Sequence, residues 1–156
     1  MIMRNLLLVM FSVLVFGATT VAQGYEYGSP TDLKGLTTVY IDTHGNIKDR
    51  EKIIEGITKA NLGLTIAESN SSAQVFLDFN TYQSIQAIST KIPTPLDPRY
   101  PVHVIQRVKT IIGVGMVAVR GKTAPRVIMN FRGSKRPVSD FVKEFITTYK
   151  KANDSK

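Results

Sequence analysis

The chain has 156 residues, of which 43% are hydrophobic and 21% are charged, and its formal net charge is +8. It contains no cysteine, which excludes disulfide bonds, a thiol nucleophile and a cysteine-ligated metal site. A chain of this size fits one domain whose core is large enough to fold without disulfides.

The first residues, MIMRNLLLVMFSVLVFGATTVAQ, have the pattern of a secretory signal peptide. A positive charge precedes an apolar run (residues 6–16), and Thr20 and Ala22 supply the small residues that a signal peptidase accepts. The run is shorter than the roughly 20 residues that span a bilayer as a helix, and no cysteine follows it to accept a lipid. We therefore expect residues 1–22 to be removed before Gln23 and the protein to be secreted or periplasmic. The alternative is a membrane-anchoring helix.

Removal of this segment leaves a net charge of +7 that is distributed unevenly. Residues 23–90 hold 5 basic and 8 acidic residues, whereas residues 91–156 hold 14 basic and 4 acidic residues. A clustered positive surface attracts anionic polymers, anionic membranes or acidic proteins.

The first half of the mature chain has a strand–helix–strand pattern. Residues 23–35 are polar and glycine-rich, which predicts a flexible leader. The β-branched and aromatic residues of 36–42 predict a strand, and the apolar spacing after Ile47 predicts a helix that ends near Asn61 or Gly63. LTIAES then predicts a second strand.

The second half contains three predicted strands and a final helix. Residues 75–82 alternate as a strand, and four prolines within residues 83–101 predict an extended loop. Residues 102–121 and 125–133 are β-rich and separated by GKTA, which indicates a hairpin. The helix begins near Pro137, and its apolar side chains recur at helical spacing: Val138, Phe141, Val142, Phe145, Ile146 and Tyr149.

This order of elements (strand, helix, four strands, helix) predicts an α/β (α+β) fold. Two helices with one apolar face each and about five strands can form a two-layer sandwich, with both helices on one face of a mixed sheet. We expect a single domain over residues 36–151 and a disordered tail over residues 152–156. The opposite face of the sheet would be free, or would meet a partner.

Asp42 and His44, in the stretch DTHGN, are the strongest candidates for a chemical site. A loop between a strand and a helix often places ligands in α/β proteins, so Asp42, His44 and Asn46 form an alternative small-ligand or hydrolytic site. The structural interpretation is that Asn46 caps the helix in a capping-box-like pair with Asp49, and that Gly45 lets the chain turn. We favour this second interpretation because no other histidine or nucleophile lies nearby in the sequence.

Two other features favour structural roles. His103 has no carboxylate within five residues, which indicates a solvent-facing or edge histidine. Gly113-Val114-Gly115 resembles part of a dinucleotide-binding loop, but β-type residues follow it, so we interpret it as a bulge or kink in a long strand.

The basic residues of the second half are the main candidates for binding. Arg107 and Lys109 are expected to share one strand face, and Arg126 and Arg132 another. The full candidate set is Arg107, Lys109, Arg120, Lys122, Arg126, Arg132, Lys135 and Arg136. Few aromatic residues interleave these charges, which argues against nucleic acid as the ligand. The alternative is a solvated face that keeps the strands soluble and protects a sheet edge.

The layout resembles a family of small bacterial envelope domains. The resemblance lies in VYID followed by a helix, in LGLTIAESNSSAQVFLDF, in the late hairpin, and in the closing DFVKEFITTYKKAN. These segments are similar to secreted proteins whose fold is akin to the amino-terminal domain of TolB and to the curli-secretion lipoprotein. Gln74 stands where that pattern usually has aspartate, and the chain lacks the lipidated cysteine. The resemblance implies a periplasmic α/β domain that acts through protein contacts.

We therefore expect an exported, non-enzymatic envelope domain without cofactor or metal. It would bind another envelope protein, or an anionic polymer or lipid surface, through a basic sheet face or hairpin.

Overall fold

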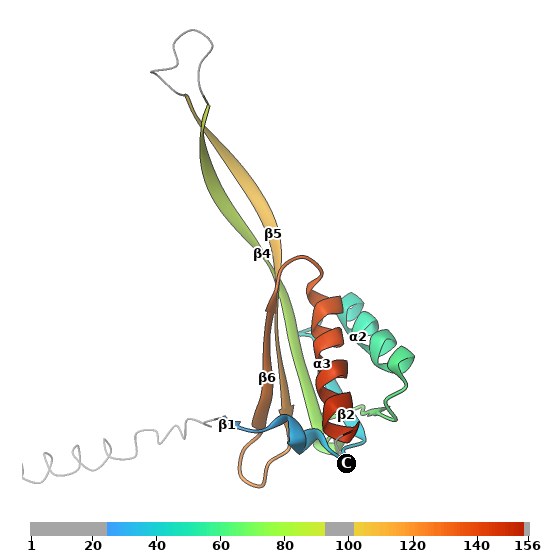
Figure 1. Cartoon of the computed structure of the whole chain (residues 1–156). Coiled ribbons are helices and arrows are strands. Elements are labelled where there is room, and N and C mark those ends of the chain that lie inside the picture. Colours follow the sequence, from blue (N-terminus) through green and yellow to red (C-terminus); the bar gives the residue numbers. More distant parts are fainter. Residues whose placement is uncertain (1–24, 93–101, 155–156) are drawn as a thin grey trace, which may run out of the picture.

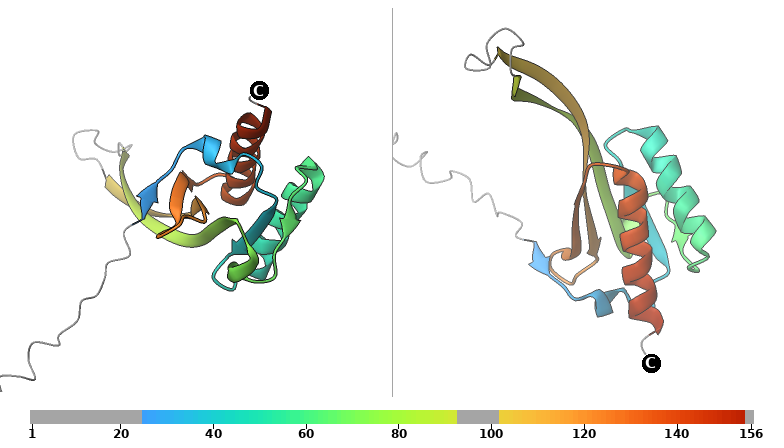
Figure 2. Two further views of the ribbon diagram at one scale, coloured as in Figure 1. Left: turned by 90° about the horizontal axis from the view of Figure 1, so that it is seen from below. Right: turned by 45° about the horizontal axis from the view of Figure 1, so that its top comes forward.

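The computed structural model describes residues 25–92 and 102–154, which form two layers (Figure 1). One layer is a six-stranded mixed sheet with the strand order β1-β6-β5-β4-β2-β3, and the other consists of helices α2 and α3 on one face of that sheet (Figure 2). The strands are β1 (Glu26–Tyr27), β2 (Thr38–Asp42), β3 (Thr65–Ile66), β4 (Val75–Ile92), β5 (Val102–Val119) and β6 (Arg126–Gly133). The helices are α2 (Ile47–Ala60) and α3 (Pro137–Asp154), with short 3-10 turns η1 (Pro30–Leu33) and η2 (Asn70–Ser72). The predicted fold class is confirmed. The expected signal peptide, residues 1–22, lies outside the described residues.

The core lies between the sheet and the two helices. The inward residues are those that the sequence alternation predicts, including Val39 and Ile41 on β2 and Val75, Leu77 and Phe79 on β4. The helices contribute the apolar faces predicted for them, including Ile53, Ile57, Phe141, Phe145 and Tyr149. The parallel pair β2–β4 and the antiparallel pairs β4–β5 and β5–β6 form the centre of the sheet.

Gly113 and Gly115 let α3 approach the sheet closely. A Cβ atom at Gly115 would lie 2.7 Å from the ring of Phe141 and 2.9 Å from the ring of Phe79. These two rings stack with their centroids 4.9 Å apart. The glycines are therefore part of strand β5, as expected, but they make room for aromatic rings. The bulge lies further on, in β6, where Ile128 is the extra residue opposite Val117 and Ala118 of β5.

Helix α2 begins and ends where the sequence predicts. The Asn46 side chain accepts a hydrogen bond from the Asp49 amide and donates one to the Asp49 carboxylate, at 3.2 and 2.7 Å. Asn61 ends the helix in the left-handed conformation, with φ of 48°.

The expected flexible leader and disordered tail need correction. Residues 26–27 pair with β6, and η1 buries Leu33 completely in the core. At the other end α3 continues to Asp154, Ala152 is buried, and the Asn153 side chain accepts a hydrogen bond from the Gly35 amide at 2.9 Å. The two segments stabilise each other through this contact. The residue spacing within either segment cannot predict it.

The proline-rich loop is shorter than predicted. Residues 83–92 belong to β4 and pair in register with residues 102–111 of β5, because the prolines begin only at position 93. The rest of the predicted loop, residues 93–101, lies outside the described residues.

The two central strands extend far beyond the sheet and form an arm. Strand β2 stops pairing with β4 at Asp78, and β6 stops pairing with β5 at Gly113. From there residues 82–92 and 102–112, which we call the arm, pair only with each other among the described residues. Eleven residues of β-strand span roughly 35 Å, and Figure 1 shows this two-stranded ribbon projecting away from both helices.

Candidate functional site

The arm carries most of the exposed large hydrophobic side chains of the described chain. Six of the nine such residues lie on it: Tyr82, Ile85, Ile88, Ile105, Val108 and Ile111. Ile105 is 68% exposed and Ile85 is 59% exposed, although both occupy strand positions. A concentration of exposed apolar side chains on one element marks an interaction site in soluble domains.

The two faces of the arm differ in charge. Phe79 and Thr81 point toward the helices, so the odd-numbered residues of β4 and their partners on β5 continue that side. We call this the basic face; it comprises Gln83, Ile85, Ala87, Ser89, Lys91, His103, Ile105, Arg107, Lys109 and Ile111. The neutral face comprises Tyr82, Ser84, Gln86, Ile88, Thr90, Val104, Gln106, Val108, Thr110 and Ile112 and has no charged residue. The prediction that Arg107 and Lys109 share a face is confirmed, and His103 is exposed as expected.

A cleft at the base of the arm continues the basic face toward the helices. This cleft has a volume of about 480 Å³ and lies between the first turn of α3, helix α2 and Ile111 of the arm. Lys52, Lys135 and Arg136 contribute its positive charges. Arg136 also pairs with Asp140 at 3.9 Å. Lys135 and Arg136, two of the predicted binding residues, therefore lie beside the arm.

Arg120 stabilises the end of the sheet that lies opposite the arm. Its guanidinium donates hydrogen bonds to the carbonyl oxygens of Ala73, Asn70 and Ser71, at 2.9, 2.6 and 3.1 Å. It also lies over the Phe76 ring, 5.5 Å from the centroid. These contacts hold η2 against β5, which gives Arg120 a structural role.

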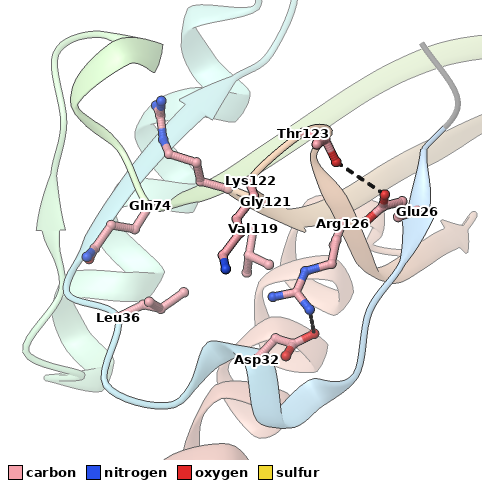
Figure 3. Close-up of a pocket in the computed structure, with 10 residues that line it drawn as sticks. Glu26, Asp32, Leu36, Gln74, Val119, Gly121, Lys122, Thr123 and Arg126 are labelled. Carbon is pink, nitrogen blue, oxygen red and sulfur yellow. Dashed lines mark hydrogen bonds and ion pairs between the residues drawn. The ribbon is translucent and has the colours of Figure 1, made fainter. Parts of the chain in front are cut away.

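Lys122 and Arg126 line an open cleft at this same end (Figure 3), with a volume of about 790 Å³. Arg126 pairs with the carboxylate of Asp32 at 3.3 Å, and Glu26 accepts a hydrogen bond from the Thr123 hydroxyl at 3.4 Å. Two carboxylates therefore offset much of the positive charge in the cleft.

The expectation that Arg126 and Arg132 share a face is wrong. Arg132 pairs with Val114, whereas Arg126 pairs with Val119, a core residue on the helix side. The bulge at Val117 and Ala118 inserts one residue into β6 between them, which moves Arg126 to the other side of the sheet. The structure thus divides the predicted basic set between two faces and two ends.

No helix of the described residues covers the sheet face opposite α2 and α3 (Figure 2), and this face is not uniformly positive. Its centre is a hollow of about 190 Å³ lined mainly by apolar and aromatic residues, including Tyr40, Phe76 and Met116. Asp42 and Asp78 also line it. The concentration of positive charge without acidic residues is therefore on the arm strands, whereas Asp49 and Asp140 lie among the positive charges at its base.

His44 has a partner that its sequence neighbours do not reveal. Its Nε2 lies 2.9 Å from Oδ1 of Asp78, which is the cross-strand neighbour of Asp42. The hydrogen bond and charge of Asp78 raise the pKa of His44 above 6.5, with a smaller contribution from Asp42. The Asp42 carboxylate also accepts a hydrogen bond from the His44 amide at 2.8 Å.

These contacts account for the conformation of the DTHGN turn. His44 and Gly45 both have positive φ, at 49° and 84°, and Asp42 and Asn46 hydrogen-bond within the turn or to the helix that follows. The His44–Asp78 pair is about half exposed. Among the described residues no group of histidine and carboxylate side chains could hold a metal ion.

The geometry defines a two-layer α+β domain with a protruding, partly basic β-arm. No protein-family model matches the sequence, and no curated protein matches it. Among solved structures, the chain is similar to a PDZ domain protein from Parabacteroides distasonis ATCC 8503, with a TM-score of 0.40 and 9% identity. The match covers 74% of this chain and 31% of that protein. Within the described residues no helix combines the length and the apolar character needed to cross a membrane.

Proposed function

We propose that this chain is an exported, non-enzymatic domain of the bacterial envelope that binds another protein through its arm. The N-terminal signal-peptide pattern supports export, and the resemblance to TolB-type envelope domains supports the compartment. The observation that carries the proposal is the arm itself. It exposes three isoleucines and three positive charges on one face and lies outside the core of the domain.

The composition of the arm favours protein over a purely anionic polymer. A polyanion is held by charge alone, so isoleucine at positions 85, 105 and 111 would bring it nothing. A protein interface, in contrast, combines an apolar centre with a charged rim. On the basic face Ile105 lies next to Arg107 along β5, and Ile85 lies opposite Lys109, so apolar and charged side chains are neighbours.

The proposal is tested by site-specific photo-crosslinking in an envelope extract of the source cells. A crosslinker at Ile105 should form a protein adduct that mass spectrometry identifies, whereas one at Lys143, exposed on α3, should not. Arg107→Glu/Lys109→Glu should abolish the adduct, because it reverses the charge that attracts the partner.

The matched control is Lys143→Glu/Lys150→Glu, which changes the net charge equally on the exposed side of α3. Equal adducts from all variants, or adducts with lipid alone, would contradict the proposal.

A further inference from the structure

The arm offers two unpaired strand edges. Residues 82–92 and 102–112 hydrogen-bond to each other, and no third strand flanks either of them among the described residues. Successive residues of a strand point their backbone groups to opposite sides, so about half of the amides and carbonyls on each strand face outward. Such an edge can pair with an added strand.

The two edges differ in their side chains. On the basic face β5 carries His103, Arg107 and Lys109, whereas β4 carries a single positive charge, at Lys91. The β5 edge also begins where β6 leaves the sheet, at the Gly113–Gly133 pair. A strand added there would continue the position of β6 along the arm.

We infer that the outer edge of β5, over residues 103–112, pairs with an extended acidic segment of the protein partner. This inference rests on the proposed function and specifies the chemistry of the partner. Because side chains alternate along a strand, the segment would have acidic residues at every second position, facing Arg107 and Lys109. Its other residues would be apolar or uncharged and would face Val104, Val108 and Ile112 on the neutral face.

Charge argues against a second copy of the chain at this edge. Two β5 edges paired with each other would bring Arg107 and Lys109 of one copy close to those of the other. Like charges directly opposite each other on neighbouring strands are destabilising. No acidic residue on either arm strand could compensate, since the nearest described carboxylates before and after the arm are Asp78 and Asp140.

The test uses a fluorescent eight-residue peptide that alternates glutamate with valine, measured by anisotropy against the full mature chain. Binding should weaken about tenfold or more in Arg107→Glu/Lys109→Glu and remain unchanged in Lys143→Glu/Lys150→Glu. It should also weaken as salt rises from about 0.1 M to about 1 M, where the screening length falls from about 10 Å to about 3 Å. The controls are a lysine–valine alternating peptide and a peptide with four glutamates followed by four valines.

Amide hydrogen exchange identifies the edge that binds. Without peptide, alternate amides of residues 103–112 should exchange fast, and these same amides should become protected when the glutamate–valine peptide binds. The outward amides of residues 82–91 should stay unprotected. This pattern distinguishes an added strand on β5 from side-chain contact alone, which would leave exchange unchanged.

Three results would overturn the inference: equal binding of the block-sequence peptide, protection on β4 in place of β5, or binding to vesicles of anionic phospholipid without binding of the peptide. If the alternating peptide does not bind but the crosslink at Ile105 forms, the inference fails and the arm still serves as the binding element. Loss of both would remove the proposed function as well.

Discussion

At the scale of single residues, His44 shows how a partner distant in sequence changes the role of a side chain. Asp78 lies 34 residues away, yet the parallel register of β2 and β4 places it beside Asp42 and within 2.9 Å of the imidazole. Two neighbouring carboxylates repel each other, and a protonated His44 offsets that repulsion. The histidine therefore stabilises the end of the β2–β4 pair.

This arrangement makes the stability of the domain depend on pH. The folded-state pKa of His44 is raised above 6.5, so its stabilising contribution is complete below that pH and is lost as pH rises through the folded-state pKa. We expect Asp78→Asn to flatten this pH dependence. The free energy of unfolding should change by less than about 1 kcal/mol, because the pair is half exposed. Urea unfolding of the wild-type protein and of Asp78→Asn, between about pH 5 and pH 9, measures the effect.

NMR titration of the His44 imidazole provides the control. Its pKa should fall in Asp78→Asn, because both the hydrogen bond and the negative charge are removed. An unchanged titration curve would show that Asp78 does not set the protonation of His44.

At the scale of elements, the contact between α3 and the sheet depends on the absence of side chains at two strand positions. Gly113 and Gly115 lie beneath Pro137, Phe79 and Phe141, with no room for a Cβ atom. The ring of Phe131 meets that of Phe141 edge-on, 5.5 Å between centroids, which completes an aromatic cluster. Both glycines are therefore required by close packing rather than by backbone conformation.

Gly115→Ala should destabilise the domain by roughly 1–3 kcal/mol, the typical cost of an overpacked core. In a Phe141→Leu background the same substitution should cost less, because the smaller side chain leaves space for the new methyl group. Chemical denaturation of the wild type, the two single variants and the double variant gives the coupling energy between positions 115 and 141. Equal costs in both backgrounds would show that the ring does not limit this site.

At the scale of the whole molecule, the hydrophobic core that stabilises the domain does not include the arm. The core residues lie between the helices and the part of the sheet before the arm, and none belongs to residues 82–92 or 102–112. An isolated two-stranded ribbon is marginally stable by itself. The arm therefore depends on the domain, whereas the domain does not depend on the arm.

Replacing residues 84–110 by an Asn-Gly turn, which joins the paired residues Gln83 and Ile111, should leave the domain folded. We expect its free energy of unfolding to change by less than about 1 kcal/mol, because no core contact is removed. Circular dichroism with urea titration measures this, and the same variant should lose the peptide binding predicted for the arm. A cooperative loss of structure would show that the arm contributes to folding.

Much of the fold was predictable because its signals are local. Alternation in 36–42 and 75–82, helical spacing after Ile47 and after Pro137, and the Asn46 and Asn61 helix ends all depend on residues a few positions apart. The arm also has a signal in the sequence. Two β-type runs of equal length, residues 75–92 and 102–119, flank the prolines.

Residue type and short-range periodicity are enough to predict the apolar faces, the order of the main elements and the concentration of positive charge after residue 90. Which charges lie together depends instead on contacts between elements that are distant in the sequence. The tertiary contacts pair β1 with β6, join the Gly35 amide to Asn153 of α3, and bring Asp78 to His44. One bulge residue in β6 places Arg126 and Arg132 on different faces of the sheet. Strand register is set by contacts between residues far apart in the chain, and a shift of one residue moves a side chain to the other face of the sheet.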